Sequence, residues 1–157
     1  PNRVGGAAMQ KNLENLGDIV YTEEEIDFAL EMQRNNGKPE LGIDGIIRPL
    51  RETLESPGGG STDSGDVSYN VPVVSLAATT APKGVPWHSW SVVASSGMSI
   101  GHKGMLHAAK ALGMTMVDIF KDSKLREDIK KEFDEKIGEY EYDPYLDPGP
   151  PPIDYVD

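Results

Sequence analysis

Apolar residues recur at the helical spacing of three to four positions in four stretches of the chain. These stretches are residues 2–16, 22–36, 99–119 and 122–137. The second opens with a capping box, Thr22 and Glu25, and the fourth can be capped by Asp122. The pattern therefore predicts four helices, of which the third should be the longest.

Two other stretches have the pattern of strands. Residues 71–78 form a nearly continuous apolar and β-branched run, typical of a strand buried on both faces, and 91–94 could form a second short strand. Residues 38–57 mix regularly spaced Ile and Leu with Gly and Pro, and the pattern leaves their conformation open. Strands that alternate with helices predict an α/β fold of layered helices and sheet.

A change of composition divides the chain after Gly138. The acidic segment that follows is rich in Pro and Tyr, so it should be extended and either lie over the surface by its Tyr rings or stay loose. We therefore expect a folded unit over residues 1–138 and a tail over 139–157.

Composition narrows the classes of function. The chain has 157 residues and a net charge of −11, with 15 Lys and Arg against 26 Asp and Glu, which argues against nucleic acid and anionic membranes as partners. It has no Cys, and no apolar run approaches the roughly 20 residues of a membrane span. We expect a cytoplasmic location. The sequence opens at Pro1 without an initiator Met, so we expect a piece of a longer polypeptide.

A Gly-rich loop at 56–66 is the first candidate for chemistry. Its glycines could form an anion nest, but Asp63 and Asp66 stand where a phosphate-binding loop needs Lys and Ser or Thr. Ser61 does not sit in a nucleophile elbow either, because Asp63 replaces the final glycine of that motif. A flexible turn and a functional loop at the end of a strand remain equally open.

Two His-containing motifs are the other candidates. His88 lies between Trp87 and Trp90, where it could be a metal ligand or, as sequence alone favours, a hydrogen-bonded member of an aromatic cluster. His102 and Lys103 at the start of the long helix could seat a carboxylate, or could form a solvated helix start. His107 follows His102 by five residues, which places the two rings about 140° apart on a helix and prevents them from sharing a metal.

The ordered strings GGSTDSGDVSYNVPVVSL and GVPWHSWSVVASSGMSIGHKGMLHAAKALG connect these motifs. Together they resemble the C-terminal half of the catalytic domain in metal-dependent amidohydrolases and carboxypeptidases of the aminoacylase type, and most of all their aminobenzoyl-glutamate hydrolase branch. The resemblance runs from about Asn2 to Gly138.

The resemblance implies a three-layer αβα domain with a mixed sheet, of the dinuclear zinc-peptidase kind, in which a lid that is missing here dimerises the parent or joins it to another subunit. It implies hydrolysis of an N-acyl or aminobenzoyl amino acid by water that two divalent ions, Zn²⁺ or Mn²⁺, activate. His88 would be a metal ligand. The residues expected to shape the pocket or contact substrate are Ser61, Thr62, Asp63, Trp87, Trp90, His102 and Lys103.

The sequence also departs from that family. Trp90 stands where many relatives have Pro, and the HxD motif, the bridging Asp and the Glu pair that supplies the base are absent. We therefore expect no catalytic base in this chain and no amidase activity from the chain alone. The alternatives are a non-catalytic binding module that kept the fold, and, less favoured, a serine hydrolase using Ser61 and His88.

Overall fold

A computed structural model describes residues 1–51, 62–144 and 149–150, and these residues form six α-helices and no β-strand. The helices are α1 (Arg3–Leu16), α2 (Glu23–Asn35), α3 (Ser64–Asn70), α4 (Trp90–Ser96), α5 (Ser99–Lys121) and α6 (Ser123–Ile137). None of the described helices has the length and apolar content of a membrane span.

The predicted αβα fold with a mixed sheet is wrong, because the described residues contain no sheet. The predicted strand at 71–78 is wrong. The main-chain hydrogen bonds of these residues with the main chain of other described residues are Asn2 N to Val73 O (3.2 Å) and Val71 N to Val67 O (3.0 Å), and neither joins an extended segment. A strand needs a neighbour about 4.8 Å away that pairs with it repeatedly. The neighbouring segment, 42–50, meets residues 79–83 through Lys83 N to Gly42 O (3.0 Å), Thr79 Oγ1 to Asp44 O (2.6 Å) and the ion pair of Lys83 with Asp44, which is not the repeated pairing of a sheet.

The second predicted strand, 91–94, is also wrong, since it lies inside α4. The side chains of Ser91 and Ser95 are buried on one face of this helix, and Ser91 Oγ accepts a hydrogen bond from Asn36 at the end of α2 (2.8 Å). A strand would place Val93 on the same face as Ser91 and Ser95, but Val93 is 73% exposed, which fits a helical turn.

The four predicted helices are confirmed as α1, α2, α5 and α6, with the expected caps. Thr22 Oγ1 accepts from Glu25 N (3.3 Å), and Glu25 Oε2 accepts from Thr22 N (2.7 Å), which completes the capping box of α2. Asp122 caps α6 by accepting from Leu125 N at 3.1 Å. At 23 residues α5 is the longest of the described helices.

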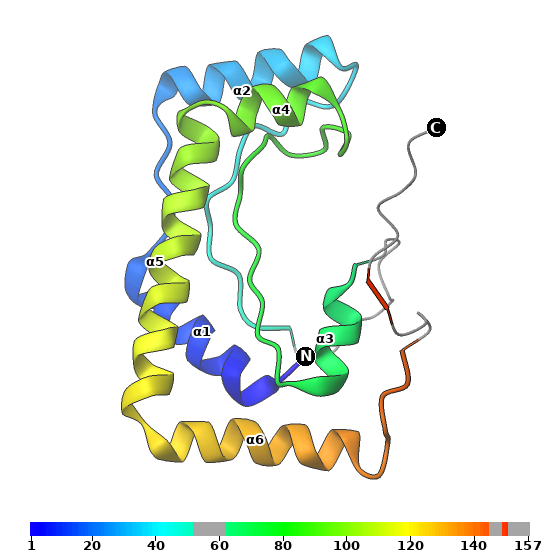
Figure 1. Ribbon diagram of the computed structural model, residues 1–157. Helices are drawn as coiled ribbons and strands as arrows, with labels where there is room; N and C mark the ends of the chain where they lie inside the picture. Colours follow the sequence, from blue (N-terminus) through cyan, green and yellow to red (C-terminus); the bar gives the residue numbers. More distant parts are fainter. Residues whose placement is uncertain (52–61, 145–148, 151–157) are drawn as a thin grey trace.

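The helices form an open frame around the two extended segments (Figure 1). Helix α5 runs along one side of this frame and packs against α1, α4 and α6. Helices α2 and α4 lie at one end of the frame, and α6 lies at the other. Segments 42–50 and 71–85 pass side by side through the middle, so the helices hold them in place where a sheet does not.

Buried polar side chains make several of the long-range connections. Asn12 on α1 donates through Nδ2 to Thr115 Oγ1 (3.1 Å) and Asp118 Oδ2 (2.7 Å), which ties α1 to α5. Glu132 on α6 accepts from the main-chain amides of Arg3 and Val4 at 2.7 to 2.8 Å, which joins α6 to the N-terminus of α1. The helix packing is thus specified by hydrogen bonds as well as by apolar contact.

The apolar core is small. Among the described residues, the buried apolar ones are Met9, Ala29, Met32, Val85, Ile100, Ala111 and Ile129.

The start of the tail packs on α3 through aromatic rings. The ring centroid of Tyr69 lies 5.1 Å from that of Tyr140 and 6.1 Å from that of Tyr142. This confirms, for the described part of the tail, the prediction that its Tyr rings lie on the surface. Nothing tests the division into 1–138 and 139–157, which stays a prediction.

Candidate functional site

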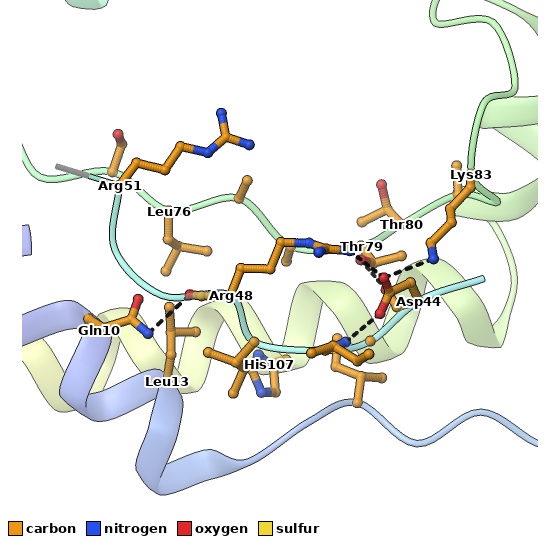
Figure 2. A pocket seen from close by; sticks show the side chains of 18 of the residues that line it. Gln10, Leu13, Asp44, Arg48, Arg51, Leu76, Thr79, Thr80, Lys83 and His107 are labelled. Carbon is orange, nitrogen blue, oxygen red and sulfur yellow. Dashed lines mark hydrogen bonds and ion pairs between the residues drawn. The ribbon is translucent and has the colours of Figure 1, made fainter. Parts of the chain in front are cut away.

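A groove of about 770 Å³ opens between the two extended segments (Figure 2). Residues 44–51 form one wall and residues 75–85 form the other. Helices α1 and α5 contribute Met9, Leu13 and His107, and Trp87 lines the groove as well. The groove therefore brings together an apolar surface, a large aromatic ring and the polar groups of both extended segments.

Asp44 is the acidic group of the groove, and cations surround it. Its Oδ2 accepts from Arg48 Nη2 (2.5 Å) and Lys83 Nζ (2.9 Å), while Oδ1 accepts from Ile46 N (2.9 Å). The hydrogen bond from the Ile46 amide and then the one from Lys83 hold the pKa of Asp44 below its usual range. Asp44 is thus an anion that accepts from three donors, which suits it to organising the groove rather than to removing protons.

The charges in this cluster do not balance. Two side-chain cations, Arg48 and Lys83, share the single carboxylate of Asp44. The groove therefore keeps a net positive charge beside Trp87, in a chain whose total charge is −11. An anion that also carries an apolar or aromatic group matches both features.

Gln33 on α2 fixes the two walls relative to each other. Its side chain is fully buried, and its Nε2 donates to Gly42 O (3.0 Å) and Lys83 O (2.8 Å) while Oε1 accepts from Gly42 N (2.9 Å). One amide thus uses both of its donors and its acceptor to hold segments that are 41 positions apart in sequence. The position of Lys83 in the groove depends on this clamp.

The sequence left open that Lys103, at the start of α5, could bind a carboxylate. In the structure its ammonium contacts the carboxylate of Glu25, a residue of the same chain. Lys103 Nζ lies 2.6 Å from Glu25 Oε2 and donates to Val20 O at 2.9 Å. Burial alone would raise the pKa of Glu25, but the hydrogen bond from Lys103, with those from Ser99 and Thr22, lowers the pKa to about 2. The role of Lys103 in contacting substrate stays a prediction.

Tyr21 lies next to this ion pair. The Lys103 ammonium sits 5.5 Å from the centroid of its ring, and its hydroxyl is buried without a hydrogen-bond partner among the described residues. Burial, together with the nearby charges of Glu25 and Asp44, raises the pKa of Tyr21 to about 12. The phenol is therefore neutral near pH 7 and adds no negative charge to the region between the ion pair and the groove.

The Trp–His–Ser–Trp motif forms an exposed loop that leads into α4. His88 has a φ of 59°, a left-handed conformation that a non-glycine residue rarely adopts, and its side chain is exposed. Trp87 and Trp90 are 71% and 59% exposed. His88 is thus not sealed inside an aromatic cluster, and Trp87 connects this loop to the groove.

The Gly-rich loop is described only in part. Ser61 lies outside the described residues. Thr62 Oγ1 accepts from Ser64 N (3.3 Å), and Asp63 precedes α3 without a side-chain cap bond. Both are exposed, and no hydrogen bond or ion pair joins either of them to His88 among the described residues.

The two His residues of α5 diverge, as their spacing predicted. His102 is exposed, whereas His107 Nε2 lies 2.8 Å from Gly17 O and borders the groove. Within the described ranges no three His, Asp or Glu side chains gather as a metal site. The side chains of the described residues therefore do not form a complete metal centre.

Sequence reasoning missed the groove cluster of Asp44, Arg48 and Lys83. The Asp44–Arg48 spacing of four residues is a common ion-pair spacing, but on a helix, and this segment is extended. Lys83 is 39 positions from Asp44, and the two segments are held together by the Gln33 side chain and by the Lys83 N to Gly42 O hydrogen bond. No local signal in the sequence could have linked them.

Comparison with known proteins shows that the chain is similar in sequence to a hydrolase subunit. It is similar to one of the subunits of p-aminobenzoyl-glutamate hydrolase from Escherichia coli (strain K12), with 33% identity over 156 residues that cover 84% of this chain and 32% of the relative. The resemblance stated from the sequence motifs is confirmed. The chain spans about a third of the length of that relative. No family model matches the chain, and no solved structure matches it.

Proposed function

We propose that the chain is part of a metal-dependent amidohydrolase that cleaves the amide bond of N-acyl or aminobenzoyl amino acids. The observation that carries this proposal is the 33% identity to a p-aminobenzoyl-glutamate hydrolase subunit. On this proposal the parent holds two divalent ions, Zn²⁺ or Mn²⁺, and is a homodimer or a heteromer. His88 contributes one metal ligand, and residues of the parent that lie outside this chain, in its N-terminal part, supply the remaining ligands and the base.

The geometry of the groove supports the substrate class. An aminobenzoyl amino acid combines an aromatic ring with carboxylates. Trp87 offers an exposed indole for stacking, and the excess positive charge of Arg48 and Lys83 lies in the same groove. In this proposal the loop residues 61–63, Trp90, His102 and Lys103 shape the pocket around the substrate.

A chimera tests the proposal. The third of the E. coli relative that this chain matches is replaced by the chain, and hydrolysis of p-aminobenzoyl-glutamate is followed with Mn²⁺ or Zn²⁺ present. We expect the folded chimera to release p-aminobenzoate and the chain alone to release none. His88→Ala should lower the rate of the chimera by about a hundredfold or more, whereas Lys131→Ala on the exposed face of α6 should not change it.

Two outcomes would contradict the proposal. A folded chimera without hydrolysis would favour the non-catalytic module, in which the fold is kept without the chemistry. A chimera that hydrolyses equally well with and without His88 would remove this residue from the metal site.

A further inference from the structure

Helix α5 has a second apolar face that the described structure leaves uncovered. Its packed face is centred on Gly104, Ala111 and Thr115, which are buried. At about 100° per residue, the opposite side of the helix forms an arc of roughly 140° with no charged residue. The residues of this arc from Met105 onward, which we call the outer face, are Met105, Leu106, Ala109, Leu112, Gly113, Met116, Val117 and Phe120.

The large side chains of the outer face are exposed to an unusual degree. Phe120 is 77% exposed, Met105 58% and Met116 56%. A helix at the surface of a globular protein normally shows an apolar stripe on one side and charged residues on the other, whereas a helix that is apolar on both sides is buried. The sequence of α5 is thus that of a helix covered on both sides.

The charges beside the outer face indicate what covers it. Lys110 and Lys121 border the arc on one side and form no ion pair with the described residues, although acids outnumber bases in the chain by 26 to 15. The one acid of α5, Asp118, already accepts from Asn12. A second copy would add another net charge of −11 and would bring a further Lys110 and Lys121 to the contact. A surface with carboxylates opposite these lysines fits better.

We propose that the outer face of α5 is an obligate interface with a companion polypeptide, related to the two thirds of the E. coli hydrolase relative that this chain does not match. The companion presents an apolar surface to Met105, Met116 and Phe120 and carboxylates to Lys110 and Lys121. The inference rests on the proposed function for the identity of the companion, and on the surface of α5 for the place where it binds.

Cysteine labelling tests the interface, because the chain has no Cys of its own. Met116→Cys and, independently, Val117→Cys place a thiol on the outer face, and Lys131→Cys on the exposed face of α6 is the matched control. Each variant is made in the isolated chain and in the chimera, and alkylation by iodoacetamide is measured on the tryptic peptide. We expect both outer-face thiols to react about tenfold more slowly in the chimera, with the control unchanged.

Three results would overturn the inference. Equal labelling of the outer-face thiols in a folded chimera shows that the companion does not cover α5. Protection in the isolated chain that grows with its concentration assigns the face to a second copy. A chimera with the original Met116 that does not fold shows that such a companion cannot accommodate this chain. Labelling does not depend on turnover, so a protected but inactive chimera contradicts only the proposed function, and an active but unprotected one contradicts only the interface.

Discussion

Replacing Glu25 with Gln removes the anion that faces Lys103 and leaves the rest of the site in place. A Gln at this position can still accept from the Thr22 amide, because capping boxes use Glu or Gln. The change therefore separates the charge of Glu25 from its role in starting α2. The ammonium of Lys103 would keep its bond to Val20 O and lose its charged partner.

The size of the effect follows from the pKa of Glu25. The fall from 4.5 to about 2 corresponds to about 3 kcal/mol of folding free energy at about 1.4 kcal/mol per pKa unit. The Lys103 side chain is 34% exposed, so solvent screens the pair and reduces its contribution. We expect Glu25→Gln to lower the free energy of unfolding by about 2 kcal/mol at pH 7.

The dependence on pH has a definite sign. The pKa of Glu25 is lower in the folded chain, so the stabilisation is fully present above pH 4.5 and is lost as the pH falls through about 2. The deficit of the variant should therefore shrink to about half its neutral value near pH 3. Burial would raise the pKa of Glu132, but hydrogen bonds from Lys136, Val4 and Arg3 lower it to about 2. Glu132 is present in both the variant and the unchanged chain, so its contribution cancels when their stabilities are compared.

Urea unfolding followed by circular dichroism at pH 7 and pH 3 measures the difference. Glu24→Gln is the matched control, because Glu24 lies in the same helical turn and is exposed. The control should lose a few tenths of a kcal/mol from its interaction with the helix dipole. A deficit of Glu25→Gln that equals the control, or that stays constant from pH 7 to pH 3, would refute the reasoning.

Two further substitutions test how the groove is held. Gln33→Leu should lower the free energy of unfolding in urea by about 2 to 4 kcal/mol, because it leaves main-chain groups of both walls without partners. The control Gln10→Leu on α1 should lower it by under about 0.5 kcal/mol, because the hydrogen bonds of Gln10 lie at the surface. Equal losses would mean that Gln33 does not hold the two walls together. Gly5→Ala should lower the melting temperature, since its Cβ would lie 2.3 Å from a methyl of Val74, whereas Gly6→Ala, with 3.6 Å to the nearest side-chain atoms, should raise it through helix propensity. A rise for both would show that segment 71–81 moves freely away from α1.

The helices could be predicted because their signals are local. The capping box of α2 joins Thr22 and Glu25, and Asp122 caps α6 three residues before its partner amide. Periodic apolar residues then extend each helix over several turns. The strands could not be predicted in this way, because a strand at 71–78 depends on a pairing partner that no residue within the run specifies. Residues 91–94 lie in a helix that buries Ser91 and Ser95 and leaves Val93 73% exposed, although two valines favour a strand.

For the candidate site as well, the sequence revealed the residues that are adjacent and missed the contacts between residues far apart. The motif around His88 was visible in the sequence because its residues are adjacent, and the structure places its Trp87 at the groove. The arrangement of the groove walls involves Gln33, a polar residue in the last turn of α2 that the sequence pattern gives no reason to select. Its fully buried amide is what brings Lys83 to Asp44 across 39 positions. A buried polar side chain with all its hydrogen bonds satisfied between extended segments thus substitutes here for the pairing that a sheet would provide, and the positive charge of the groove follows from that clamp.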